Sequence, residues 1–152
     1  MKKIKEGVFS CGDQSIIKIG HNEIDQLIEE AKSADLRRAR VNIHKSADDL
    51  LHEMIIAFTS ESEVKIHKHP NKRESFHIIR GRVQIQFYDE DLVEMIDKKV
   101  IMCSENGPYF YRMQDQLWHK VVPLSDICVI HEITDGPFIL GQSSIFPENN
   151  IK

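Results

Sequence analysis

Apolar and polar residues alternate along most of the chain beyond residue 53, and this alternation favours β-strands over helices. Val83, Ile85 and Phe87, for example, share one face of a strand predicted over residues 83–88. Such runs recur at intervals of roughly 8–12 residues, separated by glycine, proline, asparagine and aspartate, which is typical of an antiparallel sandwich or barrel. The predicted strands cover residues 54–59, 64–69, 75–80, 83–88, 92–96, 99–102, 109–113, 118–122, 127–133 and 138–145.

A segment near the N-terminus has a helical period instead. Ile24, Leu27, Ile28 and Ala31 form one apolar stripe, and Asn22 is a suitable N-cap before them. A single helix is therefore predicted, and it is expected to end within residues 33–35.

The N-terminal part of the chain thus differs from the rest. We predict short β pieces at residues 7–9 and 15–19, followed by the helix, so that residues 1–40 form a helical arm packed on a barrel. Residues 41–148 are predicted to form that barrel, and the two parts are expected to be one structural unit.

Composition restricts the class of protein. The 152 residues suffice for about one domain, and 41% hydrophobic with 29% charged residues is ordinary for a globular protein. A net charge of −4 gives no general attraction to nucleic acid, and no apolar run approaches the ~18 residues of a membrane span. Cys11, Cys103 and Cys128 are odd in number and widely spaced, which favours reduced thiols and a cytoplasmic location.

The most informative stretch is HKHPNKRESFHIIRG over residues 67–81. On a strand, His67 and His69 would point the same way because side chains at i and i+2 share a face. The intervening Pro-Asn-Lys-Arg is typical of a turn and would bring Glu74 back beside them. Two imidazoles and a carboxylate suit a first-row divalent metal with coordination positions left open.

The same residues carry a resemblance to a known superfamily. The spacing of His67, His69, Glu74 and Gly81 resembles the first motif of the cupins, which are small jelly-roll or double-stranded β-helix barrels. The resemblance implies a further histidine ligand from a later strand, and His119 is the candidate. The predicted fold is therefore all-β, a single cupin with an N-terminal α-helical arm.

Three phrases, LHEMIIAF at 51–58, HKHPNKRESFHIIRG and WHKVVPLSD at 118–126, resemble the WbuC-type cupin-fold metalloproteins. That family is associated with bacterial O-antigen and surface-polysaccharide gene clusters. The resemblance implies a bound divalent metal (Fe, Mn, Ni, Co or Zn), a ligand such as a sugar or nucleotide-sugar, and a homodimer.

Two residues near the motif have competing interpretations. His131 shares a strand face with Val129 and Ile133, so it is either a core histidine or a pocket residue acting as catalytic acid or base. Lys65 precedes His67 by two residues, so it either contacts a carboxylate or phosphate of a substrate or is solvated at a strand start.

Other candidates for substrate binding are basic or aromatic. Arg40, in the basic cluster with Arg37 and Arg38, either binds phosphate oxygens or lies solvated beyond the helix end. Phe76 and Tyr111 either form the wall of an apolar cavity or belong to the core.

Three functions remain open from the sequence. The first is a metal-dependent enzyme acting on a sugar or nucleotide-sugar, either an isomerase or epimerase or an iron-dependent dioxygenase. The second is a non-catalytic sugar-binding or sensor protein, and the third is a cupin whose metal only braces the fold. Neither nucleic acid nor a membrane is an expected partner.

Overall fold

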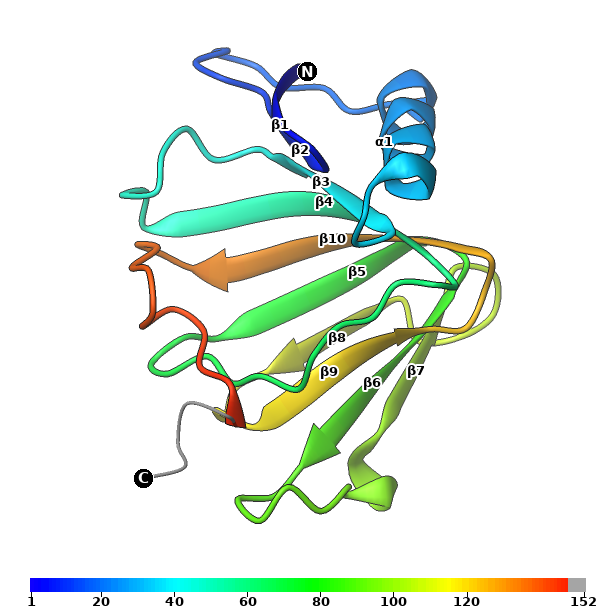
Figure 1. The fold of residues 1–152 in the computed structure, drawn as a ribbon, viewed down its shortest axis with the longest axis vertical. Coiled ribbons are helices and arrows are strands. Elements are labelled where there is room, and N and C mark those ends of the chain that lie inside the picture. The colour runs from blue at the N-terminus through cyan, green and yellow to red at the C-terminus, as the bar shows by residue number, and fades with distance from the viewer. Residues whose placement is uncertain (148–152) are drawn as a thin grey trace.

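Strands that alternate between buried and exposed residues dominate the computed structural model, which describes residues 1–147 (Figure 1). Its strands are β1 (Lys2–Lys5), β2 (Val8–Ser10), β3 (Arg38–Asn42), β4 (Leu51–Thr59), β5 (Glu74–Arg80), β6 (Arg82–Tyr88), β7 (Val100–Cys103), β8 (Phe110–Met113), β9 (Trp118–Pro123) and β10 (Ile127–Asp135). Its helical elements are α1 (His21–Ser33) and the 3-10 turn η1 (Ile96–Lys98).

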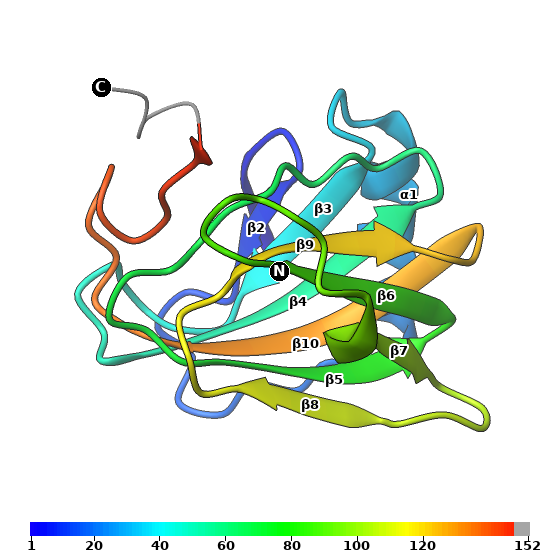
Figure 2. The same cartoon turned by 90° about the horizontal axis from the view of Figure 1, so that it is seen from below.

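These strands form two sheets that lie face to face (Figure 2). The larger sheet has the order β1-β2-β3-β4-β10-β5-β8 and the smaller one β7-β6-β9. Their inner faces share one hydrophobic core, to which Phe76 and Ile130 contribute from the larger sheet and Ile85 from the smaller. The prediction of a mostly β protein is therefore confirmed.

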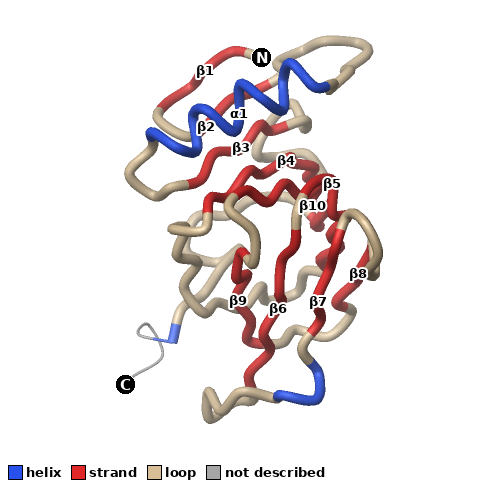
Figure 3. The backbone as a smooth tube through the Cα atoms, turned by 90° about the vertical axis from the view of Figure 1, so that its right-hand side faces the viewer, coloured by secondary structure: helices blue, strands red, loops and turns tan. Residues whose placement is uncertain are grey.

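A second core lies on the outer face of the larger sheet. Helix α1 lies along this face, beside β3 (Figure 3). The predicted helical stripe is buried there, with Leu27, Ile28 and Ala31 packing against Val41 and Val129. Strands β4 and β10 therefore contribute to a core on each face, through Ala57 and Val129 outside and through Phe58 and Ile130 inside.

The expected N-terminal helical arm is wrong in one respect. The helix is not a terminal arm, because β1 and β2 precede it and join the larger sheet. It begins at His21, so Asn22 is not its N-cap, and the Glu23 carboxylate accepts a hydrogen bond from the Gly20 N–H at 2.9 Å. Strand β3 runs across the expected boundary at residue 41, and the expected domain end at residue 148 lies outside the described residues.

Several predicted strands are absent from residues 1–147 as described. Residues 64–69 contain only single bridges, at His67 and Lys68, and residues 138–145 contain only the bridge at Ile145. Residues 15–19 and 92–95 are also irregular apart from a bridge at Glu94, and Ile96 begins η1. Strands β1 and β3 were not predicted. Within the described residues, no helix combines the length and apolarity required to cross a lipid bilayer.

Gly81 forms the whole connection between β5 and β6. Its φ is +77°, and a Cβ atom built there would lie 2.3 Å from the carbonyl oxygen of Ile127. Both the left-handed backbone and the close approach require glycine. The turn therefore connects β5 of the larger sheet directly to β6 of the smaller one.

Candidate metal centre

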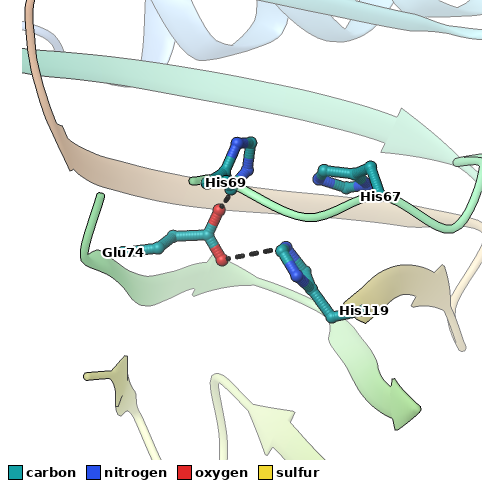
Figure 4. Close-up of side chains that lie close together, drawn as sticks. All are labelled: His67, His69, Glu74 and His119. Atoms are coloured by element: carbon teal, nitrogen blue, oxygen red, sulfur yellow. Dashed lines mark ion pairs between the residues drawn. The ribbon is translucent and has the colours of Figure 1, made fainter. Parts of the chain in front are cut away.

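Four side chains named from the sequence come together between the two sheets. His67, His69, Glu74 and His119 each offer a donor atom, and these atoms all lie within 4.8 Å of one another (Figure 4). The two histidines of the motif lie on the irregular segment before β5, Glu74 begins β5, and His119 is the second residue of β9. The larger and smaller sheets therefore both contribute to one cluster.

Backbone pairing sets the position of His67 relative to β9. The N–H of His67 donates to the carbonyl oxygen of His119 at 2.9 Å, and the reciprocal bond measures 2.8 Å. The next residue, Lys68, makes a similar pair with Ile145, at 3.1 and 2.9 Å. The segment is thus held between β9 and the C-terminal part of the described chain, although it is not a regular strand.

All three imidazole rings direct the same nitrogen, Nδ1, toward the backbone. The Nδ1 atoms of His67, His69 and His119 each lie within hydrogen-bonding distance of a backbone carbonyl, which can only accept. Each Nδ1 therefore carries the proton, and each Nε2 has its lone pair available to a metal. The carbonyl acceptors are those of Lys65 (2.8 Å), Ser143 (2.8 Å) and Leu117 (3.0 Å), respectively.

The Glu74 carboxylate lies between two of these rings. Its Oε2 is 3.2 Å from Nε2 of His69, and its Oε1 is 3.4 Å from Nε2 of His119 (Figure 4). The Tyr111 hydroxyl also donates to Oε1, at 3.1 Å. Burial alone would raise the pKa of Glu74, but the neighbouring His119 and His69 outweigh it and hold that pKa below its usual range. The carboxyl group is therefore ionised, as a metal ligand must be.

The electrostatics of His67 and the burial of His119 also suit a cation. At His69, burial would lower the pKa, but the hydrogen bond with Glu74 and the charge of Glu74 raise it, so a metal ion there displaces a proton. Burial, with the nearby His119 and His69, lowers the pKa of His67 to about 3, so this imidazole is neutral at physiological pH. His119 is fully buried, and its Nε2 has no partner in hydrogen-bonding geometry within residues 1–147. An orphaned buried nitrogen aimed at a carboxylate and two other imidazoles fits a site for one divalent metal ion.

A large cavity of about 1010 Å³ adjoins the cluster, within the size range of small-molecule sites. Three of the four residues predicted to bind substrate, Lys65, Phe76 and Arg40, line it. Tyr111, the fourth, is buried in the core and contacts Glu74 through its hydroxyl group. The C-terminal segment forms another part of the wall, through Phe138, Ser143, Ser144 and Phe146.

His131 lies elsewhere. Side chains alternate along β10, and Glu132 lines the cavity, so His131 faces the outer side of the sheet. There its Nε2 is 3.5 Å from Oε1 of Glu53, and its ring stacks on His77 with 6.0 Å between centroids. His131 shares a strand face with Val129 and Ile133, as the alternation predicted, but this face of β10 is the outer face of the larger sheet.

Glu132 is the residue that the sequence analysis missed. It lines the cavity beside the four-residue cluster, and burial together with the charge of Glu74 raises its pKa to about 7. The sequence did contain one signal for Glu132, because this residue shares a strand face with the apolar Ile130. A carboxylate among inward-facing apolar residues is unusual and indicates a functional position.

Several solved structures of other proteins have folds similar to that of this chain. The capsular polysaccharide assembling protein CapF from Staphylococcus aureus matches with a TM-score of 0.62 and 16% identity, covering 74% of this chain and 32% of that chain. Oxalate decarboxylase from Lactobacillus farciminis matches with a TM-score of 0.51 and 12% identity, covering 66% and 28%. A Bacillus subtilis oxalate decarboxylase studied for its Mn(II) centres has a TM-score of 0.50 and 14% identity, covering 65% and 24%.

The chain therefore has a cupin-like fold, and its cluster of three histidines and one glutamate is compatible with binding one metal ion. The chain belongs to the family described as Domain of unknown function (DUF6016), whose profile matches residues 19–101. A search of curated proteins found no relative. The chain spans about a third or less of the length of the three solved structures described above, at 32%, 28% and 24%.

Proposed function

We propose that this protein binds one divalent transition metal through His67, His69, Glu74 and His119, and a small sugar-related molecule in the adjoining cavity. The observation that carries the proposal is the shared orientation of the three imidazoles, whose Nδ1 atoms are all committed to backbone carbonyls. A divalent metal bound there would polarise a ligand oxygen and lower the pKa of bound water. Three nitrogens and one carboxylate leave roughly two positions open on a six-coordinate ion.

The protein's own residues provide the rest of the site. Phe76 supplies an apolar wall, Lys65 and Arg40 supply positive charge, and Tyr111 orients the Glu74 carboxylate. Glu132, with a pKa near neutrality, is placed beside the cluster to accept or donate a proton. We therefore assign the acid–base role to Glu132 in preference to His131, which faces away from the cavity.

A sugar-related ligand is supported by two separate likenesses. CapF, a capsular polysaccharide assembling protein, shares the fold. The phrases LHEMIIAF and WHKVVPLSD resemble WbuC-type proteins of surface-polysaccharide gene clusters. We propose accordingly that the ligand is a sugar or nucleotide-sugar used in surface polysaccharide metabolism.

Two further proposals concern the state of the protein. Cys11, Cys103 and Cys128 are all free thiols, which supports a reducing, cytoplasmic location. Strands β1 and β8 are the edges of the larger sheet, and exposed edges of this kind pair readily, which supports a homodimer. Light scattering coupled to size-exclusion chromatography measures the molar mass in solution and so tests the homodimer directly.

The metal assignment is tested by elemental analysis of protein purified without chelator. The wild type is expected to retain close to one metal per chain, and H67A/H69A to retain almost none. A matched control is H21A/H77A, because His21 and His77 are exposed and neither lines the cavity. Equal metal content in H67A/H69A and the wild type would overturn the proposal.

Catalysis and simple binding are separated by a second measurement. Nucleotide-sugars that raise the melting temperature only in the presence of metal are candidate ligands. Each is then incubated with the metal-bound protein and examined by NMR for isomerised or oxidised product. E132Q is expected to bind ligand but to lose turnover if the protein is an enzyme.

A further inference from the structure

Two arginine side chains of β3 lie on the same wall of the cavity. Along this strand Ala39 and Val41 are buried beneath α1, so Arg38 and Arg40 alternate to the opposite face. Both line the cavity that also contains His67, His69 and Glu74. The basic cluster noted in the sequence is therefore split, with only two of its arginines facing inward.

The third arginine shows the contrast. Arg37 has a left-handed backbone (φ +52°), and its guanidinium pairs with Glu61 at 3.0 Å outside the cavity. Arg73 and Arg80 are likewise paired, with Asp135 at 2.9 Å and Asp25 at 3.5 Å. Three of the seven arginines of the chain thus form an ion pair with a carboxylate on the protein surface, away from the cavity.

Arg38 and Arg40 lack such a partner. Within residues 1–147, neither guanidinium group forms an ion pair, and the one polar contact of the Arg38 side chain is with the Glu63 carbonyl oxygen, 3.5 Å from Nη1. Burial, and then the like charge of Arg40, lowers the pKa of Arg38. Five carboxylates of the described chain also line the cavity, and none forms an ion pair with these two groups: Glu6, Asp35, Glu63, Glu74 and Glu132. The nearest in effect is Glu132, whose pKa is lowered by the charge of Arg40 but is raised more strongly by burial and by Glu74.

We propose that Arg38 and Arg40 form a subsite for an oxyanion, either a carboxylate or a phosphate group, on the ligand of this cavity. Guanidinium groups present paired N–H donors that match such oxygens, and an anion between two like charges relieves their repulsion. This inference rests on the proposed function in taking the cavity as the ligand site.

The order of the strands in the larger sheet sets the distance that a ligand must span between the arginines and the four-residue cluster. Strands β4 and β10 separate β3 from β5, which carries Glu74, so the two sites lie about 14 Å apart at the backbone. The cavity of about 1010 Å³ spans this distance. The ligand class is accordingly an anionic sugar derivative, with its charged group on β3 and its sugar end toward the four-residue cluster.

The test is isothermal titration calorimetry of the full chain with inorganic phosphate, glucuronate and uncharged glucose. The wild type is expected to bind phosphate if the natural ligand is a sugar phosphate, or glucuronate if it is a sugar acid. R38Q, R40Q and R38Q/R40Q are expected to weaken that binding by about tenfold or more. R82Q is the matched control, because Arg82 is exposed, forms no ion pair within residues 1–147 and does not line the cavity.

Folding and metal content are measured on the same variants. The melting temperatures of R38Q and R40Q should stay close to that of the wild type. Each substitution removes the repulsion between the two arginines, which offsets the loss of the Arg38 contact with Glu63 or of the Arg40 attraction to Glu132. If the double variant does not fold, the two single variants decide the question. If the arginine variants lose anion binding but keep the metal content of the wild type, the oxyanion subsite is supported. The metal content of H67A/H69A tests the proposed function separately.

The proposal is overturned by either of two results. One is that neither phosphate nor glucuronate binds the wild type more tightly than glucose does. The other is that R38Q/R40Q binds the preferred anion as tightly as the wild type and R82Q do.

Discussion

His67 and His119 exchange both of their backbone hydrogen bonds, at 2.9 and 2.8 Å, although they belong to segments far apart in the chain. This antiparallel pair brings their imidazole rings to a centroid separation of 4.3 Å. The position of one ligand relative to the other is thus set by main-chain geometry, which side-chain substitutions nearby do not easily disturb. A cluster placed in this way is preorganised before any ion arrives.

Metal binding should stabilise the fold. His119 is fully buried, and its Nε2 forms no hydrogen bond with any of residues 1–147, so a metal would supply the missing interaction and bind the native state selectively. At a free metal concentration 100 times the Kd, the expected gain is about 2.7 kcal/mol, or a rise in Tm of about 5–11 °C. Calorimetry of chelator-treated protein with and without added metal measures it. H67A/H69A should show no rise, and a rise equal to that of the wild type would contradict the assignment.

Tyr111→Phe should weaken both stability and metal binding. The Tyr111 hydroxyl donates to Oε1 of Glu74 at 3.1 Å in a buried setting, and hydrogen bonds to charged acceptors contribute about 1.5–3 kcal/mol. Loss of this support should also lower metal affinity by about tenfold. Urea unfolding and a competition assay with a chelator measure the two effects. Tyr88→Phe is the control, because the Tyr88 hydroxyl donates to the neutral Gln86 side chain at 3.1 Å and should cost only about 0.5–1.5 kcal/mol.

Gly81→Ala should destabilise the protein more than Gly12→Ala. Both glycines have positive φ, +77° and +65°, so both substitutions incur the left-handed penalty of about 1–2 kcal/mol. Only at Gly81 would the new Cβ also meet backbone, at 2.3 Å from the Ile127 carbonyl oxygen, whereas nothing lies within 4 Å at Gly12. We expect an extra loss of about 2 kcal/mol at Gly81 in urea unfolding. Equal losses in the free energy of unfolding at the two positions would show that the contact of the new Cβ with the Ile127 carbonyl adds nothing to the cost.

Asp135→Asn should destabilise the protein in a pH-dependent way. The Arg73 hydrogen bonds to the Asp135 carboxylate, two of them at 2.9 Å, lower the pKa of Asp135 to about 2, with smaller help from Arg112. A folded-state pKa below the unfolded value near 4 stabilises the protein above pH 4, and that contribution disappears as pH falls toward 2. The pair is partly exposed, so its value is about 1 kcal/mol.

The measurement is urea unfolding of wild type and D135N at pH 7, 4, 3 and 2 with chelator present. The difference between the two proteins should be largest at pH 7 and should shrink below pH 4. A difference that stays constant down to pH 2 would mean that the ionised carboxylate is not its source.

The α-helix was predictable because its apolar stripe, with Leu27 and Ala31, needs only local periodicity to be recognised. The orientation of β10 was not predictable from pattern alone. Both of its faces are apolar, since Val129 packs beneath α1 and Ile130 packs between the sheets. The alternation therefore could not tell which of His131 and Glu132 faces the cavity.

The sequence by itself determined that the chain is mostly β, where its helix lies, and that residues 67–81 carry two histidines, an acid and a glycine at a metal-type spacing. Those features depend on short-range periodicity and turn chemistry, which neighbouring residues specify. The resemblance named His119 as a fourth ligand, but only the tertiary structure brought it beside the other three. Only the tertiary structure decided that Glu132 and not His131 faces the cavity, and that Arg38 joins Arg40 there. Each of these depends on which strands pair and which face is covered, and long-range packing sets both.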